Sequence, residues 1–215
     1  MDHVEIKDNL KFYKALSREK DIAEMHGVAM TSIAVGKNIG VAPKADLYFV
    51  ADDVYNFEQK KVDFTNYAED ILNIIELNKS LKNKIRVISI SSGYSDKESV
   101  LGADELTEAI KKAEENNIAV LCLIPGNEIN DFSSLTRVSY EDVNDINNYM
   151  PYLYEPYDKN IYVPTDKITY ASSLGEEDYA YVSWGGMSSI VPYVAGLYTL
   201  ACQVDSSITI EKLIK

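Results

Sequence analysis

Apolar segments of strand length alternate with amphipathic segments of helical length along the first half of the chain. We expect strands over residues 45–51, 85–90 and 118–124, which are apolar almost throughout. Between them, apolar residues recur at helical spacing over residues 62–82 and 103–116. Strands that are apolar on both faces need cover on both faces, and this alternation predicts a mostly parallel sheet packed between helices. The fold class is therefore α/β.

The other segments are assigned from their periodicity. Residues 1–20 are polar and mixed, and we interpret them as a loop and a short helix. Residues 25–35 are small and apolar, which suits a buried helix. Residues 128–160 are rich in Asn, Asp and Tyr, which predicts a long surface excursion or a short helix with loops. Residues 161–184 look like extended segments around a Gly-Glu-Glu-Asp turn, and residues 208–213 like a capped final helix.

Length and charge limit the class of protein. The chain of 215 residues predicts a single domain over residues 1–215. Its formal net charge of −13 argues against nucleic acid or an anionic membrane as partner, and fits either a soluble protein or one that attracts basic peptides. We find no apolar run of membrane-spanning length and no signal-peptide pattern. The compartment stays open, with the cytoplasm favoured.

The cysteines and histidines are few. Cys122 and Cys202 lie in apolar runs, and we expect buried free thiols rather than a disulfide framework. With only His3 and His26 besides, a zinc site is not expected. We expect neither a metal nor a cofactor.

A serine follows a Gly-Gly turn at the start of the longest uncharged apolar run. Ser188 comes after Gly185-Gly186, and the run continues through Cys202, which predicts a helix buried on every side. One interpretation is an N-terminal cap, with Pro192 causing a mild kink. The other is a nucleophile, because the free N–H groups and positive dipole end of a helix favour an oxyanion.

The same stretch resembles the serine motif of the subtilisin-like proteases, the subtilases. In that motif Gly-x-Ser-x-x-x-Pro opens the central helix and Val-Ala-Gly follows. Gly186, Ser188, Pro192 and residues 194–196 match in order. The Gly-x-Ser-x-Gly pattern of the α/β-hydrolases does not fit, because Ile190 stands where the second glycine belongs.

Three further stretches resemble subtilase motifs, in the family's order. His26 stands in His-Gly-x-x-x-x-Ser-Ile-Ala, followed by Gly-Val-Ala-Pro, although Ala29 replaces the family's second histidine. Residues 88–93 resemble the strand that ends in Ser-x-Gly. Asn127, between Gly126 and a glutamate, resembles the oxyanion asparagine. Taken singly, the histidine could be a core or capping residue and the asparagine ordinary turn chemistry.

The resemblance implies a three-layer subtilisin-like fold, incomplete at both ends, and a serine endopeptidase acting on a peptide or protein substrate. Ser188 would be the nucleophile and His26 its general base. The Asn127 amide and the Ser188 N–H would hold the oxyanion. The backbone of Ser91, Ser92, Gly93 and Gly126 would bind the substrate. These sites are what the resemblance implies.

The family's aspartate is the main departure. Its Asp-[Ser/Thr]-Gly motif ends an apolar strand upstream of the histidine, and residues 2–6 look like the stretch just downstream of it. We therefore expect the triad aspartate upstream of residue 1, and we interpret Asp8 and Asp21 as surface residues. The missing strand should be central, so its neighbours would lack a partner. A missing segment or a second chain would then complete the sheet, and this chain alone would be a weak or inactive peptidase.

Two loops also depart from the family. The loop over residues 35–40 is shorter than the calcium-binding loop of many secreted subtilases, so we expect no calcium there. Residues 128–160 replace the usual strand and Phe-Ser-Ser-x-Gly-Pro segment.

Two rival interpretations stay open. One is a degenerate subtilase that binds peptides or a partner without cleavage. The other is an acidic α/β structural module, which leaves the ordered motifs as coincidence. The presence of both Ser188 and His26 favours a truncated enzyme over a pseudopeptidase.

Overall fold

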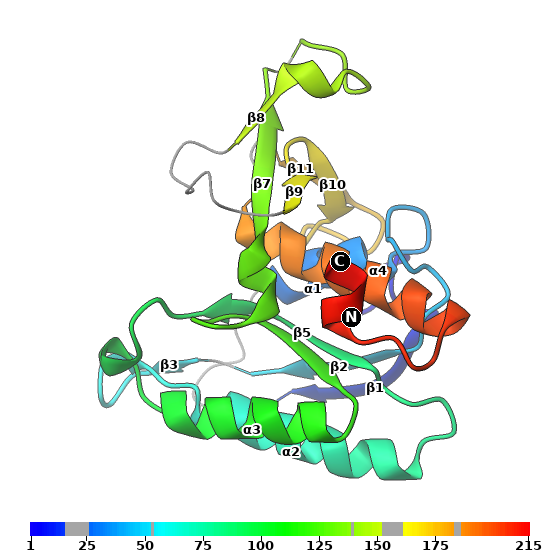
Figure 1. Cartoon of the computed structure of the whole chain (residues 1–215). Coiled ribbons are helices and arrows are strands. Elements are labelled where there is room, and N and C mark those ends of the chain that lie inside the picture. Colours follow the sequence, from blue (N-terminus) through cyan, green and yellow to red (C-terminus); the bar gives the residue numbers. More distant parts are fainter. Residues whose placement is uncertain (16–25, 53, 139, 152–160, 183–185) are drawn as a thin grey trace.

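The computed structural model describes the chain except for residues 16–25, 53, 139, 152–160 and 183–185 (Figure 1).

Two parallel strand pairs form the middle layer. Strand β1 (Leu10–Ala15) pairs with β2 (Leu47–Ala51), and β5 (Val87–Gly93) pairs with β6 (Ala119–Leu123). The three strands expected from the apolar pattern are confirmed as β2, β5 and β6. Side chains of β6 are almost all buried, as a strand covered on both faces requires.

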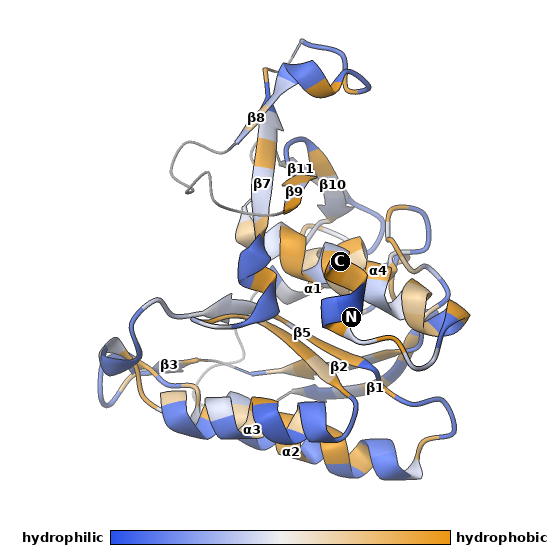
Figure 2. Ribbon diagram, in the orientation of Figure 1, coloured by the Kyte–Doolittle hydropathy of each residue, from blue (hydrophilic) through white to orange (hydrophobic). Residues whose placement is uncertain are grey.

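Helices α2 (Thr65–Ser80) and α3 (Ala103–Glu115) lie side by side on one face of these strands (Figure 1). Their apolar stripes face the strands and their polar faces point to solvent (Figure 2). This layer encloses a core whose largest fully buried side chains are Phe64, Ile71, Leu106 and Ile118. Both helices were predicted from their 3.6-residue periodicity.

Helices α1 (His26–Val35) and α4 (Met187–Val204) cover the opposite face, which makes the three-layer α/β fold (Figure 1). Helix α4 packs on β5, and α1 packs on α4. A Cβ atom on Gly196 would lie 2.6 Å from Val41 Cβ and 3.1 Å from the Ala34 carbonyl oxygen. The two helices can therefore approach this closely only because residue 196 has no side chain.

Helix α4 is less enclosed than the sequence predicts. Residues from Ile190 to Tyr198 are mostly buried, but Leu200 is 39% and Val204 91% exposed. By length and composition alone, α4 could also cross a membrane, contrary to the expectation that no run is long enough. Its packing on α1, β5 and β6 makes it the central helix of the domain instead. The short helix α5 (Ile210–Ile214) follows it.

The two parallel pairs do not form one continuous sheet. In the described part of the chain no ladder hydrogen bonds join β2 to β5. Every side chain of β2 is only half-buried, whereas those of β6 are nearly all buried. An apolar strand with this exposure has an open edge, as expected if a central strand is absent.

Strand β1 corrects the prediction for residues 1–15, whereas residues 16–20 lie outside the described residues. We expected a loop and a short helix, but Leu10–Ala15 is extended and pairs along β2. The Tyr13 ring also stacks on that of Phe49, with centroids 6.1 Å apart. The partner strand, rather than the local pattern, decides this conformation.

Residues 128–160 contain strands that the sequence analysis missed. After the 3₁₀ turn Glu128–Asp131, β7 (Phe132–Arg137) runs parallel to β9 (Ile161–Pro164) and antiparallel to β8 (Tyr149–Pro151). The turn Ile146–Asn148 precedes β8. Phe132, at the start of β7, packs with α4 in the core, and the far end of β7 together with β8 stands away from the three layers (Figure 1).

The remaining strands form two hairpins. Strands β10 (Ile168–Ala171) and β11 (Tyr179–Val182) pair around the Gly-Glu-Glu-Asp turn, which confirms the extended segments predicted there. Strands β3 (Tyr55–Asn56) and β4 (Lys61–Val62) form a short hairpin after β2. A 3₁₀ turn at Lys97–Ser99 precedes α3.

A buried carboxylate ties the N-terminal segment to the loop after α1. Glu5 is fully buried, and its oxygens accept hydrogen bonds from Asn38 N at 2.8 Å and from Ile39 N at 3.3 Å. The Tyr179 hydroxyl donates to the same carboxylate. Burial opposes the charge, but the hydrogen bonds from Tyr179, Asn38 and Ile39 hold the pKa of Glu5 below its usual value.

Candidate active site

A bulge at the end of β5 forms the centre of the candidate site. Ile90 pairs with Cys122 and Gly93 with Leu123, so Ser91 and Ser92 are extra residues in the ladder. A Cβ atom on Gly93 would lie 1.8 Å from the Leu123 carbonyl oxygen, so no other residue fits this register. The bulge turns this part of β5 toward the start of α4.

Ser188 lies in the first turn of α4, where no preceding turn supplies acceptors for the backbone N–H groups. Gly186 is the N-terminal flanking residue, in an extended conformation, and no side chain caps the helix. The prediction that Ser188 is the N-cap is therefore wrong, since it lies two residues inside the helix.

A hydrogen bond joins the bulge to Ser188. The Ser91 hydroxyl donates to the Ser188 carbonyl oxygen at 2.9 Å. In a regular helix this oxygen would accept from the N–H of residue 192, but Pro192 has none. Ser91 therefore supplies the donor that the helix lacks, and it fixes the first turn of α4 against β5.

His26 is the first residue of α1, and its side chain is exposed. Its helix packs on α4, so the two helices that carry His26 and Ser188 are neighbours. Among the described residues no hydrogen bond joins the two side chains.

Asn127 lies directly after the loop that ends β6, and its side chain is 8% exposed. Its amide nitrogen donates to the Val120 carbonyl at 2.7 Å, and its amide oxygen accepts from Cys122 N at 3.3 Å and Ile129 N at 3.2 Å. The amide is therefore held rigidly against β6. One of its two N–H bonds is used in this way.

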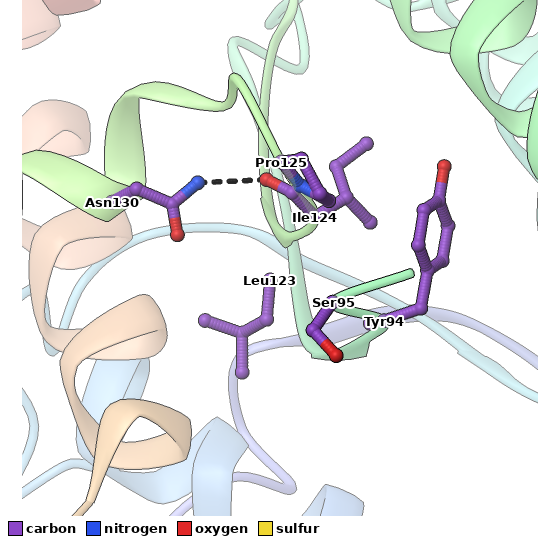
Figure 3. A pocket seen from close by; sticks show the side chains of 7 residues that line it. Tyr94, Ser95, Leu123, Ile124, Pro125 and Asn130 are labelled. Atoms are coloured by element: carbon purple, nitrogen blue, oxygen red, sulfur yellow. Dashed lines mark hydrogen bonds between the residues drawn. The ribbon is translucent and has the colours of Figure 1, made fainter. Parts of the chain in front are cut away.

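A pocket of about 430 Å³ opens beside the bulge, at the carboxyl ends of β5 and β6 (Figure 3). In parallel sheets this edge is where ligands bind. Its lining carries no charged side chain and consists of Gly93, Tyr94, Ser95, Leu123, Ile124, Pro125 and Asn130. The Asn130 amide donates to the Ile124 carbonyl at 2.7 Å and holds the pocket wall in place (Figure 3).

The sequence analysis did not single out Tyr94 or Asn130 as site residues. Their places depend on the chain direction after each strand end, which no local pattern encodes. The only signal in the sequence is that each lies near a predicted site residue. Tyr94 follows Gly93, and Asn130 lies three residues after Asn127. Gly126, which was singled out, has a φ of +83°, and nothing lies within 4 Å of where its Cβ would be.

The carboxylates considered for a triad are not near this centre in any described contact. Asp8 is exposed and lies 3.7 Å from the Lys37 ammonium, on the loop after α1. Asp21 lies outside the described residues. No group of three His, Cys, Asp or Glu side chains that could hold a metal occurs among the described residues.

The two cysteines differ in burial. Burial raises the pKa of the Cys122 thiol to about 12, and its Sγ donates to the Ser92 carbonyl at 3.3 Å. That thiol is therefore not a nucleophile at neutral pH. Cys202 is only half-buried, contrary to the expectation that both cysteines are enclosed.

Comparisons with known proteins bear on the family and on the fold. The sequence model of the subtilase family matches residues 3–150, a stretch that holds His26 and Asn127 and ends before Ser188. No curated protein sequence matches the chain.

Solved structures resemble the chain over more of its length than the family model matches. A cold-adapted subtilisin-like serine proteinase is 16% identical, with a TM-score of 0.63 over 99% of this chain and 74% of that one. Sphericase is 15% identical, with a TM-score of 0.66 over 99% and 76%. The patellamide maturation protease PatG is 20% identical, with a TM-score of 0.53 over 87% and 53%. At these identities the structures show the shared fold.

Proposed function

Because the chain belongs to the subtilase family, we propose that it is a serine endopeptidase that cleaves peptide bonds through an acyl-enzyme on Ser188. The hydrogen bond from Ser91 to the Ser188 carbonyl is the observation that carries the proposal. It ties Ser188, the proposed nucleophile, to a strand bulge whose last residue, Gly93, lines a pocket, and an extended peptide could lie along this strand.

In the first step, the Ser188 hydroxyl attacks the carbonyl carbon of the scissile bond, and His26 takes the hydroxyl proton. The histidine then gives that proton to the leaving amine, and an ester on Ser188 is left. A water molecule, deprotonated by His26 in turn, hydrolyses the ester and restores the hydroxyl. Each step needs only that the His26 ring reach Ser188, and their helices are neighbours.

The oxyanion of each tetrahedral intermediate needs hydrogen-bond donors that are already in place. We assign the Ser188 N–H, in the first turn of α4, and the second N–H of the Asn127 amide. Three hydrogen bonds already orient this amide, so little reorganisation is needed when the charge develops.

The substrate backbone would pair with Ser91, Ser92 and Gly93 as an added strand. The side chain before the scissile bond would then enter the adjoining pocket. Because no charged side chain lines this pocket, we expect a preference for large apolar or aromatic residues.

The open edges of β2 and β5 support a further part of the proposal. An extended segment, from the same protein or from a second chain, would pair with both edges and complete the sheet. We propose that this segment carries the carboxylate that orients His26. Removing the triad aspartate of subtilisin lowers turnover by roughly 3 × 10⁴, so activity without this carboxylate would be weak.

The test is hydrolysis of two quenched-fluorescence peptides that differ only in Phe or Glu before the scissile bond. We expect slow turnover of the Phe peptide, with kcat/KM lowered at least ~10²-fold by Ser188→Ala and by His26→Ala. The two losses should not add in the double variant, because the side chains act as a unit. Turnover that survives Ser188→Ala would contradict the proposal.

A further inference from the structure

The arm formed by β7 and β8 begins at the wall of the candidate pocket. Asn130 lines the pocket, and β7 starts at Phe132. The six residues of β7 span about 20 Å at 3.3 Å per residue. The described residues between the two strands, 138 and 140–148, therefore lie far from the pocket end of the arm, and we call them the tip (Figure 1).

The tip exposes apolar side chains that a folded protein usually covers. Tyr140 is 86% exposed, Ile146 68% and Val143 56%. Val138 and Met150 flank them and are also exposed. Exposed apolar side chains that gather in one small segment indicate an interaction surface.

Hydrogen bonds within the tip fix this arrangement. Asp142 Oδ1 accepts from Asn144 N at 2.9 Å, and Asp145 Oδ1 accepts from Asn147 N at 3.0 Å. The Tyr149 hydroxyl donates to the Val143 carbonyl at 3.1 Å. Polar side chains thus stabilise the turns, while the apolar side chains are left exposed.

Buried charges hold the arm at its base. The Asp166 carboxylate, with its side chain 1% exposed, lies 3.5 Å from both Arg137 Nε and Lys167 Nζ. Lys167 also donates to the Val138 carbonyl at 3.2 Å. The Arg137 guanidinium lies 5.8 Å from the centre of the Tyr149 ring. These contacts link β7, β8 and the β9–β10 turn, so the tip is held at a fixed place relative to the pocket.

The charge of the tip selects the kind of partner. Glu141, Asp142 and Asp145 lie among the apolar side chains, and no Lys or Arg occurs in the described residues between 138 and 151. A second copy of this chain is a poor partner, because its net charge of −13 would repel. A polypeptide segment with both basic and apolar residues is complementary.

We propose that the tip is an exosite that binds a basic and apolar segment of the polypeptide substrate, remote from the scissile bond. The proposal rests on the proposed function, because it takes the bound polypeptide to be the substrate of a peptidase. The binding itself does not require catalysis. The enzyme would then prefer proteins with such a segment about 20 Å from the cleavage site, the span of β7.

The test uses the whole chain with Ser188→Ala, so that no probe is cleaved. The probe is a fluorescein-labelled peptide of alternating Lys and Leu, compared with one of alternating Glu and Leu, by fluorescence anisotropy. Tyr140→Ser with Ile146→Ser alters the apolar tip. Leu174→Ser with Val204→Ser is the matched control, since these side chains are 88% and 91% exposed elsewhere. Glu141→Gln is paired with Glu105→Gln on α3 as the charge control.

We expect the Lys-Leu peptide to bind, and its Kd to rise at least ~10-fold in the tip variant and by less than twofold in the control. Glu141→Gln should weaken binding more than Glu105→Gln. An unchanged Kd in the tip variant, or no binding by the parent, would overturn the proposal. Self-association that the tip variant abolishes would overturn it in favour of a second copy. Because no outcome depends on hydrolysis, failure of the exosite and failure of the peptidase function are distinguishable.

Discussion

The hydroxyl of Ser91 replaces the helical hydrogen bond that Pro192 denies to the carbonyl of Ser188. The Ser91 Oγ to Ser188 O distance is 2.9 Å, and residue 192 is the position whose N–H would otherwise donate. A proline four residues after the serine thus has a physical consequence. It leaves the serine carbonyl free to bind the neighbouring strand.

Removing the Ser91 hydroxyl should therefore cost stability only while Pro192 is present. Ser91→Ala leaves a carbonyl without a donor, and we expect the free energy of unfolding to fall by about 1–2 kcal/mol. In a Pro192→Ala background the new N–H can take over, so the cost of Ser91→Ala should become much smaller. Urea unfolding of the four proteins of this cycle measures the coupling. Equal costs in both backgrounds would show that the hydrogen bond does not serve this purpose.

Gly196 should tolerate no side chain, because α1 and its following loop lie against it. The Cβ of Gly196→Ala would lie 2.6 Å from Val41 Cβ, and we expect a loss of about 1–3 kcal/mol in unfolding free energy. Val41→Ala should recover part of this loss. Gly186→Ala is the control, since nothing lies within 4 Å of its Cβ. A loss as large at Gly186 as at Gly196 would contradict the packing argument.

Glu5 should stabilise the fold in its charged form. Its pKa is lowered in the folded chain, so its contribution is complete above the unfolded value near 4.5 and disappears as the pH falls through the folded value. We expect Glu5→Gln to cost about 1–3 kcal/mol at pH 7 and clearly less at pH 3. Asp8→Asn, at an exposed carboxylate, should cost little at either pH. If Glu5→Gln lowers the free energy of unfolding by the same amount at pH 7 and at pH 3, the charged carboxylate is not what stabilises the fold.

The gap between β2 and β5 should be visible in hydrogen exchange. Alternate amides of a parallel strand point to opposite neighbours, so those of Leu47–Ala51 that face away from β1 lack a ladder partner. We expect them to exchange faster than the amides of β6 that bond to β5. If a longer form of the protein supplies the missing strand, the same β2 amides should become slow. Uniform protection across β2 and β6 in this chain would contradict an open edge.

The sequence predicts those parts of the fold whose conformation is encoded locally. Strands β2, β5 and β6 are apolar on both faces, and α2 and α3 show a clear helical period, so all were predicted. Strand β1 was missed because its conformation comes from pairing with β2. Strand β7 was missed because Ser133 and Ser134, which are fully buried, look like loop residues in the sequence.

In the candidate site too, features encoded in a local motif were predicted and features set by the tertiary structure were not. The motifs at Ser91 and Ser188 were found in the sequence, and the structure joins them by a hydrogen bond. The roles of Ser188, His26 and Asn127 stay predictions. Two features of the site could not be predicted, because they depend on the direction of the chain after each strand ends. Asn130 lines the pocket, and the Asn127 amide already donates one N–H to β6. A sequence pattern gives residue types and spacing, but not which of their hydrogen bonds are already used.

The most direct measurement is the intact mass of the chain after exposure to a fluorophosphonate probe, with Ser188→Ala as control. The account predicts a single adduct on the wild type that is absent from Ser188→Ala, and slower labelling in His26→Ala, because the probe reacts only with a serine whose proton a base can take. An adduct that persists in Ser188→Ala, or no adduct on the wild type, would contradict the assignment of Ser188 as the nucleophile.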